Sequence, residues 1–274
     1  MPTNSDKSLP ELDGWALVLG ASSGFGASAC SHFALAGMNV VGVHLDRRAN
    51  VEKTQQLVSD IQALGREAWF YNVNAADPAK RAHVLGDLRR RFAERGKKEQ
   101  VRVLLHSLAF GALKPFTHLE PDARIATSQL DMTLDVMANS LVYWTQDLLS
   151  EDLFALNSRI FAMTSTGSGK SWGGYGAVSA AKAALESHVR QLSLELSPRG
   201  ITANAICAGV TDTPALRKIP EAESMIETAL RRNPSGRLTQ PADVAQALVA
   251  LALPNTYWMT GNVICVDGGE AHSG

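Results

Sequence analysis

The sequence predicts an α/β protein: a Rossmann-type, doubly wound parallel sheet of about seven strands, covered by helices on both faces, in a single domain. Three observations predict it. Residues 15–19 form a wholly apolar run, typical of a strand buried on both faces of a parallel sheet. A glycine-containing loop and an alanine-rich helical segment follow directly. Strand-like and helix-like segments then alternate with short joins to the end of the chain, the pattern of a parallel sheet.

The expected elements can be placed in order from apolar runs, helical periodicity and glycine stops. Strands are expected at 15–19, 39–43, 67–71, 101–106, 159–164, 202–206 and 263–266. Helices are expected at 27–36, 51–64, 79–95, 131–149, 175–196, 221–232 and 242–253. Residues 1–12 are polar and predict a flexible tail, so the catalytic domain is expected over 13–274. Residues 213–237 depart from the short joins and predict a lid over the site.

Composition excludes several classes of protein. The chain has 26 basic and 27 acidic residues, without the basic excess that nucleic-acid binding normally requires. Its apolar runs are too short to span a bilayer, and its polar start predicts no secretory signal. Three widely spaced cysteines form neither a disulfide framework nor a metal-ligand spacing. We therefore expect a cytoplasmic protein without a metal, a nucleic-acid partner or a membrane partner.

The glycine loop predicts a dinucleotide site. Its spacing is Gly-x-x-x-Gly-x-Gly, which differs from the more familiar Gly-x-Gly-x-x-Gly. A strand, a glycine loop and a helix together place backbone N–H groups and a helix N-terminus against a pyrophosphate. The candidate cofactor-binding residues in this loop are Gly20, Ser22, Ser23, Gly24, Phe25 and Gly26.

Further candidates follow the other strands, because ligands of such sheets bind outside the carboxyl ends of the strands. They are His44, Arg47, Arg48, Asn72, Val73, Ser107, Leu108, Ala109, Gly209, Val210, Thr211 and Thr213. Arginines after the second strand suit a 2′-phosphate, whereas an acidic residue there favours NAD. Arg47 and Arg48 therefore favour NADPH, and Asp46 leaves NADH possible.

Tyr175 and Lys182 are the candidate catalytic pair. They are seven residues apart, almost two helical turns, so both lie on one helix face. An ammonium group there favours the phenolate and lowers the pKa of the tyrosine, which suits a proton donor or a polarising hydrogen bond. An ordinary amphipathic helix is the alternative for an isolated pair.

The motifs together resemble the short-chain dehydrogenase/reductase family from Trp15 to Gly269. The matching residues are the three loop glycines, Asn72, Val73, Asn139, Ser165, Lys182, Asn204, Gly209, Thr213 and the closing 266–269. The resemblance implies hydride transfer with NAD(H) or NADP(H). It also implies that Lys182 binds the nicotinamide ribose, that Asn139 holds a water near Lys182, and that Ser165 is either a catalytic serine or a loop cap. A catalytic role for His106 is not expected.

Two departures point to one branch of the family. The usual tyrosine position, four residues before Lys182, holds Val178, and Tyr175 lies one turn earlier. The usual Asn-Asn-Ala-Gly after the fourth strand is replaced by residues 106–109, His-Ser-Leu-Ala. Both look like the enoyl-acyl-carrier-protein reductases, and residues 211–237 look most like their NADPH-using bacterial subgroup. This implies reduction of 2-enoyl thioesters of acyl carrier protein or coenzyme A. Moving the tyrosine three residues shifts its base by roughly 4.5 Å, toward a carbonyl two carbons from the hydride acceptor.

Two other functions stay open. One is a carbonyl reductase or alcohol dehydrogenase with an unusual tyrosine. The other is a non-catalytic nucleotide-binding family member, which Val178 favours and the Tyr175–Lys182 pair opposes.

Two expectations concern partners. By resemblance, helices 131–149 and 175–196 pair between subunits. The second helix carries more apolar surface than one face needs, so we expect a homotetramer. The predicted lid carries Arg217, Lys218, Arg231 and Arg232, a basic face that would steer an acidic carrier protein to the site.

Overall fold

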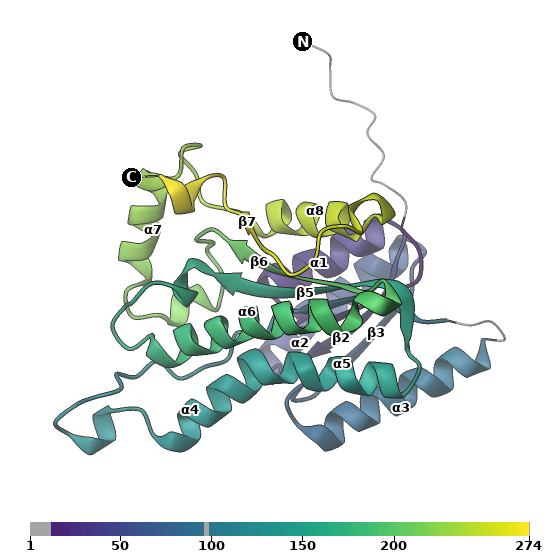
Figure 1. Ribbon diagram of the computed structural model, residues 1–274, viewed down its shortest axis with the longest axis horizontal. Coiled ribbons are helices and arrows are strands. Elements are labelled where there is room, and N and C mark those ends of the chain that lie inside the picture. The colour runs from purple at the N-terminus through teal and green to yellow at the C-terminus, as the bar shows by residue number, and fades with distance from the viewer. Residues whose placement is uncertain (1–11, 96–98, 274) are drawn as a thin grey trace, which may run out of the picture.

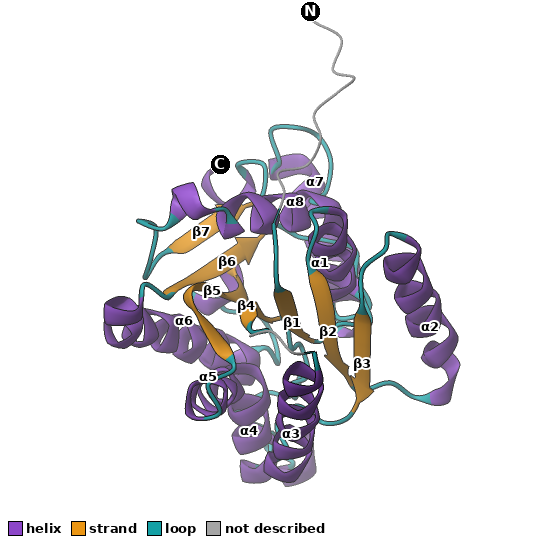
Figure 2. Ribbon diagram, turned by 90° about the vertical axis from the view of Figure 1, so that its right-hand side faces the viewer, coloured by secondary structure: helices purple, strands orange, loops and turns teal. Residues whose placement is uncertain are grey.

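The computed structural model describes residues 12–95 and 99–273, except for the side chains of Arg48 and Ala49, and confirms the predicted fold. Within these residues, seven strands form one parallel sheet in the order β3-β2-β1-β4-β5-β6-β7 (Figures 1 and 2). The strands are β1 (Trp15–Leu19), β2 (Asn39–His44), β3 (Ala68–Asn72), β4 (Val101–His106), β5 (Phe154–Ser165), β6 (Thr202–Ala208) and β7 (Val263–Val266).

Helices cover both faces of the sheet (Figure 2). Those of the described residues are α1 (Gly24–Leu35), α2 (Arg48–Ala63), α3 (Pro78–Glu94), α4 (Thr127–Leu134), α5 (Ser140–Ser150), α6 (Gly176–Leu196), α7 (Ala222–Arg232) and α8 (Pro241–Ala252). One core cluster joins the sheet to α3, α5 and α6, and a second joins its other face to α1, α2 and α8. The chain is therefore a three-layer sandwich.

Strand β1 shows why the apolar run forms the centre of this sandwich. Its five residues are all fully buried. Because side chains alternate along a strand, Trp15, Leu17 and Leu19 enter the α3–α5–α6 cluster, whereas Ala16 and Val18 enter the other. β1 pairs with β2 on one side and β4 on the other, which is the point where the strand order reverses. Ligand sites of such sheets lie at this point.

The helix predicted at 131–149 is interrupted. It consists of α4, a π-helical turn at Asp135–Asn139 and α5. A π-turn inserts one residue into the helical register and is often found at functional sites. The turn ends at Asn139, one of the predicted site residues.

One argument for a tetramer is wrong. The apolar residues of helix 175–196 on which it depended are all buried inside the single chain, at most 6% exposed: Val178, Ala181, Leu185, Val189, Leu192 and Leu196. They cover the sheet and the π-turn and so are not surplus surface. The homotetramer stays a prediction.

Residues 1–11 of the predicted tail lie outside the described residues. Leu12 is described, and its backbone N–H donates to the carbonyl of Ala36 at 2.6 Å. No helix in the described part of the chain has the length and apolar character needed to cross a membrane.

Candidate active site

The glycine loop is shaped by close backbone contacts. Gly20 has a φ of +90°, and a Cβ added there would lie 2.4 Å from the carbonyl oxygen of Ser107. A Cβ on Gly26 would lie 2.0 Å from the carbonyl oxygen of Gly20. Each contact is too short for any side chain, so both positions require glycine. The loop is held tight against β4 and the first turn of α1.

The N-terminus of α1 is open to an anion. Ser23 is its N-cap residue, and its side chain makes no cap hydrogen bond; the first turn has no acidic residue. The first N–H groups of a helix lack intrahelical partners and carry partial positive charge. Together with the glycine cradle, this helix end fits the pyrophosphate of a dinucleotide.

The loops after β4 and β6, which carry other predicted cofactor residues, lie at the same edge of the sheet as the glycine loop. Ser107 donates its N–H to the carbonyl of Leu19 at 2.8 Å, which ties the loop after β4 to the end of β1. Thr213 lies 3.4 Å from the position of a Cβ on Gly24, so the loop after β6 reaches the glycine loop. The remaining predicted cofactor residues lie in these same loops, apart from Phe25 in the first turn of α1: Ser22, Leu108, Ala109, Gly209, Val210 and Thr211.

The end of β2 holds a buried polar cluster. His44 is 7% exposed, and its Nδ1 lies 2.9 Å from Oδ2 of Asp46. The hydroxyl of Thr54 donates to the same oxygen at 3.0 Å. Burial lowers the pKa of His44, although Asp46 opposes this. The Asp46 carboxylate is thus engaged inside the fold.

Arg47 and Asn72 border this cluster. Arg47 is exposed, precedes the first residue of α2, and has no ion pair among the described residues. Asn72 exchanges two hydrogen bonds with the backbone of Asp46, and Val73 donates to the carbonyl of His44. The side chain of Arg48 lies outside the described part of the structure.

Tyr175 lies immediately before α6, beside the end of β5. The phenol lies beside Ser165: a Cβ on Gly167 would lie 2.7 Å from the Tyr175 ring and 3.0 Å from the Ser165 hydroxyl, which accepts the N–H of Gly167 at 3.2 Å. The Trp172 ring packs edge-on against the Tyr175 ring, with ring centroids 5.5 Å apart. Burial raises the pKa of Tyr175, and Ser165 opposes this. The prediction that Lys182 lowers this pKa is wrong: burial raises the pKa, and Lys182 is not among the groups that act on it.

Lys182 is buried, at 7% exposure, and donates from Nζ to the carbonyl oxygen of Met163 at 2.6 Å. Burial lowers the pKa of its ammonium group to about 8, and the charge of Glu186 opposes this. Glu186 itself accepts a hydrogen bond from Thr164 at 2.7 Å. Lys182 is therefore attached to β5, two residues before Ser165.

Asn139 faces α6. Its Oδ1 lies 3.0 Å from Nε2 of His188, one of the side chains on that helix. The hydroxyl of Tyr143 is also hydrogen bonded with Asn139. Asn139 thus joins the π-turn to α6, and its predicted role toward a water stays a prediction.

His106 is a packed residue, as expected. It is fully buried, with Nε2 2.8 Å from the hydroxyl of Ser140, which donates in turn to the carbonyl of Val136. Burial, with the Lys182 charge, lowers the pKa of His106 to about 3. The neutral imidazole ties β4 to the π-turn.

Val178, at the family's usual tyrosine position, is 6% exposed and belongs to a cluster with Met137 and Ala181. A Cβ on Gly111 would lie 2.9 Å from Cγ2 of Val178. The loop after β4 therefore closes over this position. Tyr175, one turn earlier, is the phenol that the site presents.

The predicted lid forms α7 and a preceding turn, and most of its basic side chains have partners. Arg217 pairs with Asp212 and Glu223, and Arg232 donates to the carbonyl of Ser273. Residues 213–237 contain five basic and three acidic side chains, and the fifth basic residue, Arg237, pairs with Asp243. The predicted basic face is therefore reduced to the exposed Lys218 and Arg231.

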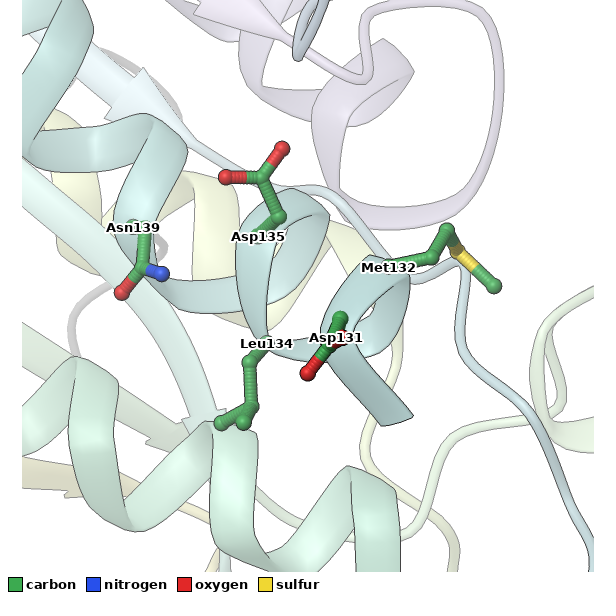
Figure 3. A pocket seen from close by; sticks show the side chains of 5 residues that line it. All are labelled: Asp131, Met132, Leu134, Asp135 and Asn139. Carbon is green, nitrogen blue, oxygen red and sulfur yellow. The ribbon is translucent and has the colours of Figure 1, made fainter. Parts of the chain in front are cut away.

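A hollow of about 400 Å³ lies elsewhere, on α4 and the π-turn (Figure 3). Its lining residues are Asp131, Met132, Leu134, Asp135 and Asn139. Apart from Asn139 it shares no residue with the predicted site, so it is not where the strand ends converge. The described residues contain no group of three His, Cys, Asp or Glu side chains suited to a metal.

Sequence reasoning missed three side chains near these groups. Glu186 lies four residues after Lys182, a helical spacing that could have indicated it. Trp172 precedes Tyr175 in a glycine-rich loop without a regular period. Glu270 contacts the loop after β6 from the C-terminal turn, and no sequence signal connects those segments.

Comparison with known proteins covers nearly the whole chain. Residues 20–270 match the family model described as enoyl-(acyl carrier protein) reductase. The chain is 28% identical to (2S)-[(R)-hydroxy(phenyl)methyl]succinyl-CoA dehydrogenase subunit BbsD of Thauera aromatica, over 93% of this chain and 96% of that one. It is 26% identical to 3-oxoacyl-[acyl-carrier-protein] reductase FabG of Thermotoga maritima, over 92% and 96%.

A solved structure agrees in fold. Enoyl-[acyl-carrier-protein] reductase (NADH) of Aquifex aeolicus superposes with a TM-score of 0.79 at 22% identity, covering 98% of this chain and 99% of that one. Together with the glycine cradle and the Tyr175–Lys182 region, the match to the family model shows which family the chain belongs to. The chain belongs to the short-chain dehydrogenase/reductase family, in the group described as enoyl-(acyl carrier protein) reductase, and is an NAD(P)-dependent oxidoreductase.

Proposed function

We propose that this protein is a cytoplasmic, NADPH-dependent reductase of 2-enoyl thioesters, of the kind used in fatty-acid synthesis. The observation that carries the proposal is the contrast between positions 175 and 178. Val178 is closed off under Gly111, whereas Tyr175 lies beside Ser165 at the end of β5. The phenol is thus displaced by one helical turn from the position that suits ketone reduction.

Tyr175 acts as a hydrogen-bond donor. The cofactor, when bound, supplies a hydride to the β-carbon of the substrate, and negative charge then develops on the thioester carbonyl oxygen. Burial raises the pKa of Tyr175, so the phenol keeps its proton at neutral pH and donates to that oxygen. The neighbouring Ser165 opposes the rise in the pKa of the phenol, and we assign it to orienting Tyr175.

Lys182 supplies positive charge close to this site. With a pKa near 8, most of its ammonium groups are protonated at neutral pH. Its bond to the Met163 carbonyl holds it against β5, and Glu186 supports the cation. We assign it to the nicotinamide ribose, as its family position implies.

The choice of NADPH is supported by the end of β2. Asp46 is the residue that would favour NADH, but its carboxylate is engaged by His44 and Thr54. Arg47 is exposed and without an ion pair among the described residues, so its guanidinium is available to a 2′-phosphate.

The surroundings of Tyr175 suit an apolar acyl group. Phe110 and Phe116 are 58% and 53% exposed, although phenylalanine is normally buried. The Phe116 ring lies 2.6 Å from the position of a Cβ on Gly176, directly after Tyr175. Phe116 and Trp172 thus give the site an apolar wall, which supports a fatty thioester carried by coenzyme A or an acyl carrier protein.

A carbonyl reductase is the second candidate. The neighbouring Ser165 and Tyr175 hydroxyls also suit polarisation of a ketone, and the Thermotoga relative is named as a 3-oxoacyl reductase. The two candidates differ in where the hydride goes, so their substrates separate them.

The test measures NADPH oxidation with crotonyl thioesters beside ketones and a 3-oxoacyl thioester. We expect the highest kcat/KM with the enoyl thioester and a fall of about 10²–10³-fold in Tyr175→Phe. Tyr257→Phe is the matched control, since Tyr257 is 57% exposed in the turn before β7. A ketone or 3-oxoacyl substrate with the higher kcat/KM would refute the enoyl assignment.

A further inference from the structure

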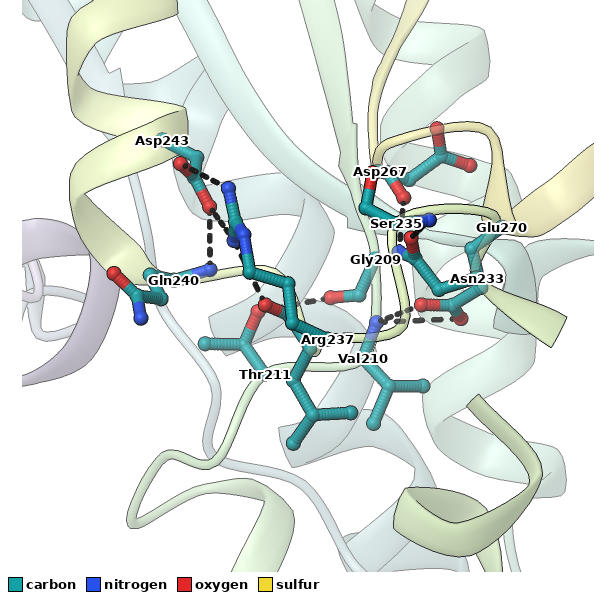
Figure 4. A network of polar contacts seen from close by, with 11 residues as sticks. Gly209, Val210, Thr211, Asn233, Ser235, Arg237, Gln240, Asp243, Asp267 and Glu270 are labelled. Atoms are coloured by element: carbon teal, nitrogen blue, oxygen red, sulfur yellow. Dashed lines mark hydrogen bonds and ion pairs between the residues drawn. The ribbon is translucent and has the colours of Figure 1, made fainter. Parts of the chain in front are cut away.

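The C-terminal turn returns to the loop that follows β6. Glu270, in the short helical turn Glu270–His272, is 9% exposed. Its Oε2 and Oε1 lie 3.1 and 3.3 Å from the backbone nitrogen of Val210, which donates to both (Figure 4). The Val210 N–H is therefore bound within the protein, and the assignment of Val210 to the cofactor stays a prediction.

Both polar groups of the peptide bond between Gly209 and Val210 are hydrogen bonded. The N–H of Val210 donates to Glu270, and the carbonyl oxygen of Gly209 accepts from the hydroxyl of Thr211 at 3.0 Å (Figure 4). A peptide plane with both polar groups bound cannot rotate freely. Its orientation sets the direction of the backbone groups that follow in residues 210–213.

Close packing supports this arrangement. A Cβ on Gly209 would lie 2.9 Å from Oε2 of Glu270 and 2.3 Å from the hydroxyl of Thr239. Gly209 is therefore needed for close approach, which lets the Glu270 carboxylate reach the backbone. The turn and the loop form one packed unit.

The C-terminal turn is also fixed to the predicted lid. Asn233 donates to the carbonyl of Asp267 at 2.9 Å, and Arg232 donates to the carbonyl of Ser273 from Nε and Nη2 at 3.1 and 2.7 Å. The Asp267 carboxylate accepts the N–H groups of Gly269 and Ala271. The C-terminal turn thus connects the end of α7 to the loop after β6.

Holding a carboxylate here costs free energy. Burial raises the pKa of Glu270, Asp267 adds to the rise, and the Val210 N–H, Lys170 and Arg232 oppose it. A buried charge is generally disfavoured unless it is well paired. An apolar side chain would fill this position at less cost, so the acceptor has a use beyond packing.

We propose that Glu270 is a positioning residue for cofactor binding: through the Val210 N–H it fixes the backbone of loop 209–213, which faces the dinucleotide site. The proposal rests on the proposed function only in taking that loop as part of the cofactor site. Thr213 lies 3.4 Å from the position of a Cβ on Gly24, so loop 209–213 reaches the glycine loop, and a change in its backbone alters this approach.

The test compares Glu270→Ala with Glu270→Gln, well below the melting temperature of each. Gln keeps an oxygen acceptor for the Val210 N–H and removes the charge, whereas Ala removes the acceptor. We expect the Kd for NADPH, measured by fluorescence, to rise about tenfold in Glu270→Ala and less than about threefold in Glu270→Gln. Glu94→Ala is the control, since Glu94 is an exposed residue of α3 paired with Arg90.

Amide hydrogen exchange of the cofactor-free protein gives a second readout. Peptides covering 209–213 should exchange faster in Glu270→Ala and as in wild type in Glu270→Gln. Equal NADPH affinity in Glu270→Ala and wild type, or equal losses in both Glu270 variants, would overturn the positioning role alone. A wild-type protein that binds neither NADPH nor NADH would overturn it together with the proposed function.

Discussion

Backbone atoms form one end of the candidate site, at the glycine loop, whereas side chains form the other, at the end of β5. At the glycine loop, backbone atoms of β1, β4 and α1 approach so closely that Gly20 and Gly26 leave no space for a methyl group. At the end of β5, buried side chains carry the site, and burial changes the pKa of both Tyr175 and Lys182. The first end is therefore sensitive to added volume, and the second to charge and protonation.

Adding one methyl group at the glycine end should have the largest effect. In Gly26→Ala the new Cβ would lie 2.0 Å from the Gly20 carbonyl oxygen, so the loop or α1 must shift. We expect a loss of about 3 kcal/mol or more in the free energy of unfolding and no measurable NADPH binding, by denaturant titration and fluorescence.

Gly86→Ala is the matched control for the same chemical change. A Cβ at Gly86, inside α3, would meet no atom within 4 Å. Alanine in a helix interior should therefore raise the unfolding free energy by about 0.5–1 kcal/mol. If Gly26→Ala were as stable as Gly86→Ala, the close contact with Gly20 would not exist in solution.

Sequence predicted the glycine end well because its requirements are local. A buried strand, a tight turn and a helix start each have a residue pattern, and together they locate Gly20 and Gly26 without knowledge of distant contacts. The parallel sheet followed from the same patterns. The start of β5 did not: Phe154–Asn157 precede the predicted strand, and Asn157 has a φ of +59°, which strand patterns do not indicate.

Removing the Lys182 charge should give the next largest effect, with opposite signs for activity and stability. We expect kcat/KM of Lys182→Met to fall about 100-fold, or about 2.7 kcal/mol. In wild type, activity should decline as the pH rises through about 8, where Lys182 loses its proton.

The stability of Lys182→Met should increase, although its activity falls. Because the folded state lowers the pKa of Lys182 from 10.5 to about 8, the cation destabilises the fold fully below pH 8, and this cost disappears as the pH approaches 10.5. Lys182→Met should thus gain about 1–2 kcal/mol at pH 7 and little at pH 10, in denaturant titrations. The exposed Lys53→Met is the control; a less stable Lys182→Met at pH 7 would contradict the buried cation.

The side-chain end could be predicted only in part. Helical spacing places Tyr175, Lys182 and Glu186 on one helix, but it does not show that burial raises the pKa of Tyr175. The contact of Asn139 with His188 depends on the π-turn, which no residue pattern announced. Such features depend on how two helices pack, which is information spread over the whole chain.

A smaller effect is expected from Arg47, which lies between β2 and α2. Arg47→Gln should raise the KM for NADPH about tenfold, or about 1.4 kcal/mol, because one charge-assisted bond to the 2′-phosphate is lost. The KM for NADH should change little, since NADH lacks that phosphate. The exposed Arg124→Gln, in the loop before α4, is the control. Equal losses with both cofactors would mean that Arg47 serves another purpose.

The smallest effect concerns the lid, where the carrier of the substrate would dock. Of the four residues of the predicted basic face, Arg217 is paired with Asp212 and Glu223, and Arg232 is bound to the Ser273 carbonyl. Only the exposed charges can steer an acidic carrier protein, so the test replaces Lys218 and Arg231 with Gln.

We expect kcat/KM with carrier-bound crotonyl substrate to fall about two- to threefold at low salt, with no change for the coenzyme A thioester. The loss should disappear near 0.5 M salt, where a screening length of about 4 Å removes long-range attraction. Lys53→Gln is the control, because Lys53 is an exposed residue of α2, outside the lid. An equal loss with both substrates would place Lys218 and Arg231 in the shared reaction and remove the docking role, leaving the lid as a cover.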